Sequence, residues 1–233
     1  MNDTERTPEF LLVHGAWHRS WCWSELQDAL SAHGWTSHTV DLPSVVDEGT
    51  GGRLPGLLDD ARVIREKIAA IEGPVVVVGH SYGGAPVTQA TAGAADVAHV
   101  VYVAAFALDE GESLTTCFGG EQPDLAIVEG VIPVRENPAE TLYNDVPEDK
   151  RDAALARLLP QTALSFAEPV NQAGWKTLPT SYVVCDDDRS LPPSYQEPFA
   201  ERTDTTYHLT SGHTPMLSMP EELAGVLDRI ARQ

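Results

Sequence analysis

Basic residues are scarce in this sequence. Among its 233 residues, 15 are lysine or arginine and 35 are aspartate or glutamate, which gives a net charge of −20 at pH 7. Phosphate backbones and anionic lipid surfaces repel so acidic a chain. We therefore expect no nucleic acid and no membrane among its partners, and we attribute the acidity to solubility.

Cysteines are few and long apolar runs are absent. The three cysteines, Cys22, Cys117 and Cys185, cannot all pair, and their spacing does not match a metal site. No apolar run approaches the roughly 20 residues that a membrane-spanning helix needs. Residues 1–9 are polar and lack the apolar core of a signal peptide. We therefore expect a cytoplasmic protein. Because the sequence also has no glycine-rich phosphate loop, we expect no cofactor.

The chain is organised around Gly79-His80-Ser81-Tyr82-Gly83. Four valines, residues 75–78, precede this motif and predict a strand buried on both faces. Residues 85–92 follow it and predict a helix with a proline in its first turn. Ser81 would then lie on a sharp strand-to-helix turn, where glycines on either side avoid collisions with neighbouring backbone. This arrangement is typical of a nucleophile elbow.

Strands and helices alternate along most of the chain. The apolar patterns predict strands at 10–14, 36–40, 75–78, 99–103, 180–185 and 205–209, and helices at 23–33, 57–71, 85–92, 194–202 and 221–232. Such alternation favours a mostly parallel sheet with helices on both faces. Ligands bind beyond the carboxyl ends of the strands in these sheets, so His14-Gly15-Ala16 and Ser81 should converge there.

The alternation stops between residues 107 and 179. This stretch contains scattered prolines and helix-like pieces such as 147–158, but no obvious buried strand. So long a segment within a compact domain predicts an insertion with its own structure, which we interpret as a helical lid over the site. The whole chain, 1–233, is then a single domain.

Four motifs carry a resemblance to a known family. They are, in chain order, His14-Gly15-Ala16-Trp17, Gly79-His80-Ser81-Tyr82-Gly83-Gly84, Asp187-Asp188-Arg189-Ser190-Leu191-Pro192 and Ser211-Gly212-His213-Thr214-Pro215-Met216. Their order is that of the α/β-hydrolase fold. More narrowly, the chain resembles the small esterases related to plant methylesterases and hydroxynitrile lyases, and their bacterial relatives.

The resemblance implies a catalytic triad. A serine hydroxyl is a weak nucleophile, so Ser81 needs a histidine base that is itself oriented by a carboxylate. His213, in a Gly-His turn after the last strand, matches the family's base, and Asp188 aligns with its acid. Asp187 is the next candidate for the acid and Asp109, after an earlier strand, the third.

The same resemblance assigns the groups around the triad. The backbone N–H groups of Ala16 and Tyr82 would form the oxyanion hole. His14 would fix the loop that carries Ala16 by hydrogen bonding, and the His80 side chain would point away from Ser81. The apolar residues near these motifs that could line the pocket are Trp17, Tyr82, Phe106, Trp175 and Met216.

The predicted function is hydrolysis of small carboxylic esters through an acyl-enzyme, with a small-molecule ester as the partner; a homodimer stays open. A hydroxynitrile lyase is one alternative, but lyases of this family carry a lysine after the catalytic histidine and a hydroxyl residue in the oxyanion loop, where this chain has Thr214 and Ala16. Small-molecule receptors on the same scaffold are the other alternative.

Overall fold

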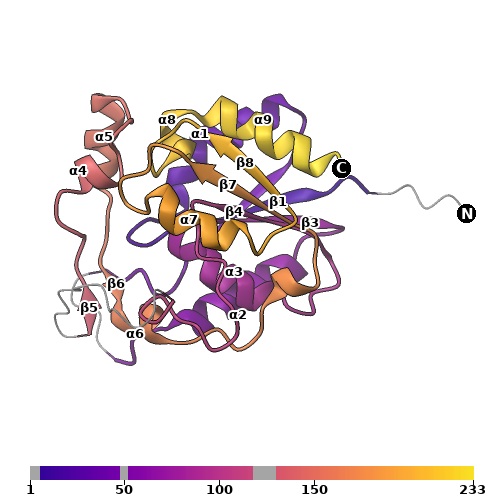
Figure 1. The fold of residues 1–233 in the computed structure, drawn as a ribbon, viewed down its shortest axis with the longest axis horizontal. Coiled ribbons are helices and arrows are strands. Elements are labelled where there is room, and N and C mark those ends of the chain that lie inside the picture. The colour runs from indigo at the N-terminus through magenta and orange to yellow at the C-terminus, as the bar shows by residue number, and fades with distance from the viewer. Residues whose placement is uncertain (1–5, 48–51, 118–129) are drawn as a thin grey trace, which may run out of the picture.

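The computed structural model describes residues 6–47, 52–117 and 130–233, and a six-stranded sheet forms its centre (Figure 1). The strands lie in the order β2-β1-β3-β4-β7-β8, and every neighbouring pair is parallel. Their bounds are β1 Glu9–Val13, β2 Ser37–Val40, β3 Val75–His80, β4 Val97–Val103, β7 Thr180–Cys185 and β8 Thr205–Leu209. The predicted α/β-hydrolase architecture is confirmed.

Burial explains the place of each strand in the sheet. β3, with its four valines, lies between β1 and β4, and all six of its residues are buried. The edge strands β2 and β8 are only partly buried or exposed. A strand that is apolar throughout is stable only where helices cover both of its faces.

Helices cover both faces of the sheet (Figure 1). On one face α1 packs against α9, and on the other α2 packs against α3 while α7 contacts β7. Their bounds are α1 Ser24–Ala32, α2 Leu57–Ala69, α3 Gly84–Thr91, α7 Pro193–Ala200, α8 Pro215–Ser218 and α9 Pro220–Ala231, with short 3-10 helices η1 Ser20–Trp23 and η2 Ser81–Gly83. The strands and longer helices match the predicted ranges to within two residues at either end, whereas η1, η2 and α8 were not predicted.

The insertion, residues 107–179, connects β4 to β7, and part of it lies outside the described residues. It holds short elements: β5 Val131–Ile132, α4 Pro138–Thr141, α5 Glu148–Leu155, β6 Gln161–Thr162, α6 Ala163–Ala167 and η3 Gly174–Lys176. β5 and β6 pair as an antiparallel ladder, a small second sheet that was not predicted. The predicted helix at 147–158 is observed as the shorter α5.

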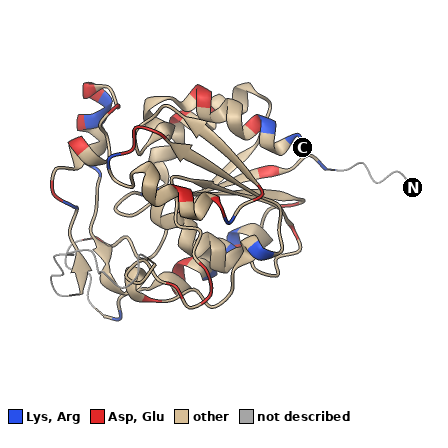
Figure 2. Cartoon of the chain, in the orientation of Figure 1, with Lys and Arg blue, Asp and Glu red and all other residues tan. Residues whose placement is uncertain are grey.

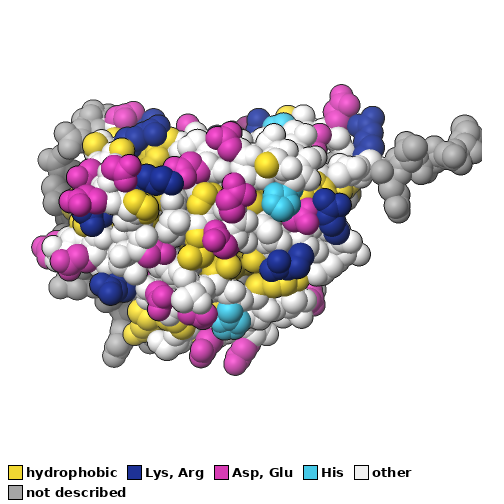
Figure 3. Space-filling model, turned by 90° about the horizontal axis from the view of Figure 1, so that it is seen from above, with side chains coloured by type: hydrophobic (Ala, Val, Ile, Leu, Met, Phe, Trp, Pro, Cys, Tyr) yellow, Lys and Arg dark blue, Asp and Glu magenta, His cyan; other side chains and the backbone are white. Residues whose placement is uncertain are grey.

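Acidic residues are distributed over many of the helices and loops (Figure 2). They occupy the first turns of α2, α5 and α9, where the helix dipole favours negative charge. The face seen from above carries acidic side chains with basic ones between them (Figure 3). Within the described ranges, no helix combines the length and apolar character needed to cross a membrane.

Candidate active site

Ser81 follows β3 directly and begins η2. Its backbone φ is +50°, a strained value for a residue with a side chain. A β-carbon on Gly79 would lie 3.0 Å from the Gly84 Cα, and one on Gly83 would collide with the His14 carbonyl oxygen. The tight turn therefore requires glycine at both positions, as expected for a nucleophile elbow.

The loop after β1 lies against this serine. A β-carbon placed on Gly15 would be 2.9 Å from the Ser81 Cβ, so the backbone that leads into Ala16 lies too close to the serine for a side chain to fit between them. His14 Nδ1 is 2.9 Å from the Gly15 carbonyl oxygen, and its Nε2 accepts the Leu42 N–H at 3.0 Å. His14 is thus built into the loop through both ring nitrogens.

His213 and Asp188 form a buried pair at the ends of β8 and β7. His213 Nδ1 lies 2.7 Å from Asp188 Oδ2, and both residues are almost fully buried. A carboxylate can only accept, so Nδ1 carries a proton, and in the neutral ring the lone pair is then on Nε2. The Ser190 and Leu191 N–H groups donate to Asp188 Oδ1 at 2.7 and 2.8 Å.

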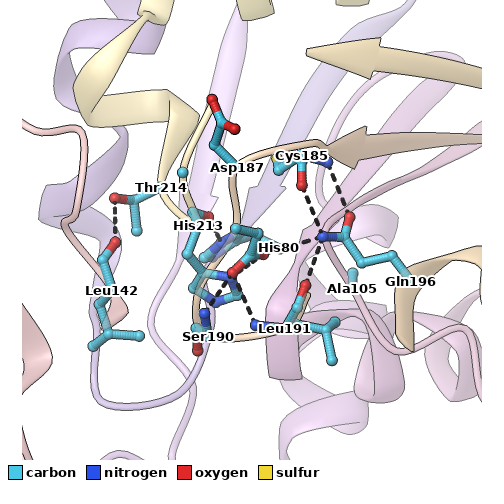
Figure 4. Close-up of polar contacts among 12 residues, drawn as sticks. His80, Ala105, Leu142, Cys185, Asp187, Ser190, Leu191, Gln196, His213 and Thr214 are labelled. Atoms are coloured by element: carbon cyan, nitrogen blue, oxygen red, sulfur yellow. Dashed lines mark hydrogen bonds and ion pairs between the residues drawn. The ribbon is translucent and has the colours of Figure 1, made fainter. Parts of the chain in front are cut away.

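Gln196 of α7 supports the loop that carries Asp188. Its side-chain amide donates to the Cys185 and Leu191 carbonyl oxygens at 3.1 and 2.7 Å and accepts the Cys185 N–H at 3.0 Å (Figure 4). It also lies 3.3 Å from Asp188 Oδ2. A fully buried amide with every group engaged keeps this loop rigid. Gln196 was not predicted, because it lies in a helix whose sequence carries no signal for this role.

The other candidate acids, Asp187 and Asp109, lie elsewhere, as does Asp186 beside them in the chain. The exposed Asp187 side chain points away from His213 (Figure 4). Asp186 pairs with His208 at 2.8 Å on the surface. Asp109 pairs with Lys176 at 2.5 Å.

Three further histidines are buried near the His213 loop or the loop after β1. His80 Nε2 donates to the His213 carbonyl oxygen at 2.8 Å, and the two rings are 4.8 Å apart. His18 bonds the Ala16 carbonyl oxygen through Nδ1 and the Tyr143 hydroxyl through Nε2, both at 2.8 Å. Burial lowers the pKa of His14 to about 4, that of His18 to about 3 and that of His80 well below the usual value. These residues are neutral at pH 7, and the role of His18 in the loop was not predicted.

The insertion contacts the loops of the His213–Asp188 pair directly. Thr214 donates its hydroxyl proton to the Leu142 carbonyl oxygen at 2.8 Å (Figure 4). The Asp145 carboxylate accepts the Gly212 N–H at 2.6 Å, and Asn144 donates to the Asp187 carbonyl oxygen at 3.1 Å. Residues 142–145 therefore hold both loops.

The predicted pocket residues lie in different environments. Trp17, with φ +64°, packs beside Phe166 of α6 at 6.2 Å between ring centroids. The Phe106 N–H donates to the Ser81 carbonyl oxygen at 3.2 Å. Met216 is fully buried in α8. Trp175 donates to the Leu108 carbonyl oxygen at 2.8 Å, and no described contact joins it to Ser81.

No cluster of three or more histidine, cysteine, aspartate or glutamate residues suited to a metal occurs in the described part of the chain. The three cysteines are free thiols.

Helices cover both faces of the parallel sheet, a strained serine follows its central strand, and a buried histidine–aspartate pair lies at the same edge. Together these features define the α/β-hydrolase class. The comparisons with known proteins agree. The model of the alpha/beta hydrolase family matches residues 10–226, so the chain belongs to that family.

Similar proteins include hydrolases and esterases. The chain is 32% identical to a probable hydrolase of a Phoma species, over 96% of this chain and 98% of that protein. It is 31% identical to a carbendazim hydrolyzing esterase of a Nocardioides species, over 92% and 96% of the two chains. Among solved structures, a pyrethroid hydrolase from Sphingobium faniae has a TM-score of 0.83 at 24% identity and 97% coverage of each chain. That likeness shows the shared fold.

Proposed function

We propose that this protein is a serine esterase that cleaves small carboxylic esters through an acyl-enzyme, with Ser81, His213 and Asp188 as its triad. The observation that carries the proposal is the 2.7 Å hydrogen bond between His213 Nδ1 and Asp188 Oδ2. It leaves His213 Nε2 free to accept a proton. Relatives named as a carbendazim hydrolyzing esterase and a methylesterase support ester hydrolysis as the reaction.

In the first half-reaction, Ser81 Oγ attacks the ester carbonyl carbon while His213 Nε2 takes the hydroxyl proton. Asp188 stabilises the imidazolium that forms. The protonated His213 then donates its proton to the leaving alkoxide, the C–O bond breaks, and the alcohol departs. Water attacks the acyl-enzyme by the same route, with His213 again as base, and releases the carboxylic acid.

The tetrahedral intermediates carry a negative oxygen. We assign its stabilisation to the backbone N–H groups of Ala16 and Tyr82. The close approach of the Gly15 backbone to Ser81 supports the first, and the position of Tyr82 directly after Ser81 supports the second. Loss of one such donor typically costs about 2.7–4 kcal/mol of transition-state stabilisation.

We assign the insertion, residues 107–179, the role of a lid that covers the bound ester. Its hydrogen bonds from Asp145 and Leu142 to the His213 loop support a place beside the reacting atoms. The lyase alternative is not favoured, because Thr214, which replaces the lysine of such lyases, is buried and bonded to Leu142. Cyanide would lack its stabilising cation there.

The proposal is tested with a graded series of p-nitrophenyl esters and the variant Ser81→Ala. We expect turnover that falls as the acyl chain lengthens and a loss of at least about 1,000-fold in kcat for the variant. A fluorophosphonate should label the wild-type protein once, with the added mass on the peptide that contains Ser81.

The outcomes are distinct. Substantial turnover by a folded Ser81→Ala variant, or labelling at another residue, would contradict the nucleophile assignment. A folded wild-type protein that binds esters without cleaving them would instead favour a receptor, and cyanohydrin cleavage would restore the lyase.

A further inference from the structure

A buried carboxylate lies on the core face of α2. Asp60 is fully buried, next to the apolar residues Ala61 and Ile64 on that face. Among the described residues its hydrogen-bond partners are Ser44 and Tyr82, and no lysine, arginine or histidine pairs with it. A buried carboxylate without a cation is strongly unfavourable unless hydrogen-bond donors surround it. Burial raises the pKa of Asp60 to about 7.

Three donors surround this carboxylate. The Ser44 N–H donates to Asp60 Oδ1 at 3.0 Å, the Ser44 hydroxyl donates to Oδ2, and the Tyr82 hydroxyl donates to Oδ2 at 2.5 Å. Burial raises the pKa of Tyr82 well above its usual value, so its hydroxyl stays a donor. Tyr82 is the residue whose backbone N–H we assign to the oxyanion hole.

The same network reaches the other side of the oxyanion hole through Gln161 of β6. The buried Gln161 donates to the Ser44 hydroxyl at 2.6 Å and to the Ser165 hydroxyl at 2.9 Å, and its carbonyl oxygen accepts the Trp17 N–H at 3.3 Å. Trp17 directly follows Ala16, the second assigned donor, and has a φ of +64°.

When Asp60 is ionised, the direction of every hydrogen bond in the network is fixed. Both amide protons of Gln161 are used, so the hydroxyl protons of Ser44 and Ser165 must go elsewhere. Ser165 donates to the Thr162 carbonyl oxygen at 2.7 Å, and Ser44 donates to Asp60. A network whose members are all satisfied holds its ends rigidly.

We propose that Asp60 is a positioning residue for ester hydrolysis, which, through Ser44 and Gln161 on one side and the Tyr82 hydroxyl on the other, fixes the separation of the two oxyanion donors. The inference rests on the proposed function. Transition-state stabilisation by backbone N–H groups depends on their placement, because a displacement of about 1 Å can cost about 100-fold in rate.

The ring of Tyr82 is also held in place, by a contact separate from that of its hydroxyl. It stacks on Phe166 of α6 at 5.5 Å between centroids, with the planes 17° apart. Tyr82→Phe therefore removes the hydroxyl and keeps the stacked ring and the backbone N–H. Asp60→Asn keeps the shape of the carboxylate but offers an amide where the network needs an acceptor.

The test compares kcat, KM and inhibitor affinity for Tyr82→Phe, Asp60→Asn and the double variant on the best p-nitrophenyl ester. We expect each single variant to lose about tenfold in kcat with little change in KM. Affinity for a trifluoromethyl ketone, whose tetrahedral adduct carries an oxyanion, should fall by a similar factor. The double variant should lose little more than Asp60→Asn alone, because the Tyr82 hydroxyl acts through Asp60.

Tyr102→Phe is the matched control. Its hydroxyl is buried and bonded to Thr88 at 2.8 Å in the core, and it takes no part in the oxyanion network. We expect it to lose stability without losing kcat. If Asp60→Asn does not fold, Tyr82→Phe and Ser44→Ala decide the question by the same readouts.

Wild-type kcat in folded Tyr82→Phe and Asp60→Asn would overturn the inference, as would a rise in KM alone or an equal loss of kcat in Tyr102→Phe. Ser81→Ala in the same series separates this failure from failure of the proposed function. Residual turnover by Ser81→Ala would refute the assignment of Ser81 as the nucleophile. An inactive Ser81→Ala variant together with wild-type kcat in Tyr82→Phe would refute only the role of Asp60.

Discussion

Three consecutive aspartates follow β7, and each lies in a different environment. Asp186 bonds the exposed His208, Asp187 projects from the surface, and Asp188 is buried against His213. Only the last accepts backbone N–H groups and a histidine at once. Chemically identical side chains thus differ in role because the turn gives each of them a different burial and different hydrogen-bond partners.

This difference predicts unequal effects of the same substitution. Asp188→Asn should reduce kcat on a short-chain ester by about 1,000-fold or more, because an amide can donate to His213 Nδ1 and impose the wrong tautomer. Asp187→Asn should stay within about twofold of wild type, since an exposed side chain changes little. Steady-state kinetics of both folded variants measure this. Equal losses of kcat in the two variants would show that Asp188 is not the aspartate of the triad.

At the scale of elements, the turn between β3 and α3 depends on glycine. The Gly83 Cα faces the His14 carbonyl oxygen so closely that no side chain fits. Gly225, in the middle of α9, has open space within 4 Å of the point where a β-carbon would lie. The two glycines therefore have opposite consequences when replaced.

Gly83→Ala should lower the free energy of unfolding by about 3 kcal/mol or more, because the backbone of β1 or η2 must shift. Gly225→Ala should raise it by about 0.5–1 kcal/mol, since alanine restricts the unfolded chain and suits a helix. Urea unfolding of both variants is the measurement. A stability of Gly83→Ala close to that of wild type would show that the turn relaxes freely.

The sequence predicts well what is local and poorly what is not. The valines of β3 and the apolar stripe of α2 determine those elements directly, and glycine spacing indicates the turn at Ser81. The network of Asp60 and Gln161 could not be predicted, because these residues are far apart in the chain and meet only after folding. The short elements of the insertion are likewise held by contacts with distant loops rather than by their own patterns.

At the scale of the whole molecule, burial of neutral histidines makes stability depend on pH. His14, His18 and His80 are all fully or nearly fully buried. Burial depresses their pKa, to about 4 for His14 and about 3 for His18. Below about pH 6.5 these histidines therefore bind protons in the unfolded chain but not in the folded one. The fold therefore keeps its full stability with respect to these groups above a pH of about 6.5, and loses stability as the pH falls towards their lowered pKa values.

At about pH 5, we expect the free energy of unfolding to fall by about 4 kcal/mol per pH unit from these three groups, or about 1.4 kcal/mol per pH unit from each. His18→Gln should reduce that slope by about a third, whatever its effect on stability at pH 7. His208→Gln, at an exposed position, serves as the control. Urea titrations across the pH range measure the slopes, and an unchanged slope in His18→Gln would disprove its contribution.

The hydrogen bonds that join the insertion to the rest of the domain limit how it can be exchanged. Gln161 reaches the loop after β1, while Asp145 and the Leu142 carbonyl reach the loop that carries His213. A chimera that grafts a relative's insertion onto this sheet would replace these contacts together with the surface that we propose as the lid. On the proposed function, substrate preference and catalytic competence are therefore not separate modules, and we expect a transplant to succeed only if it carries equivalents of these residues with it.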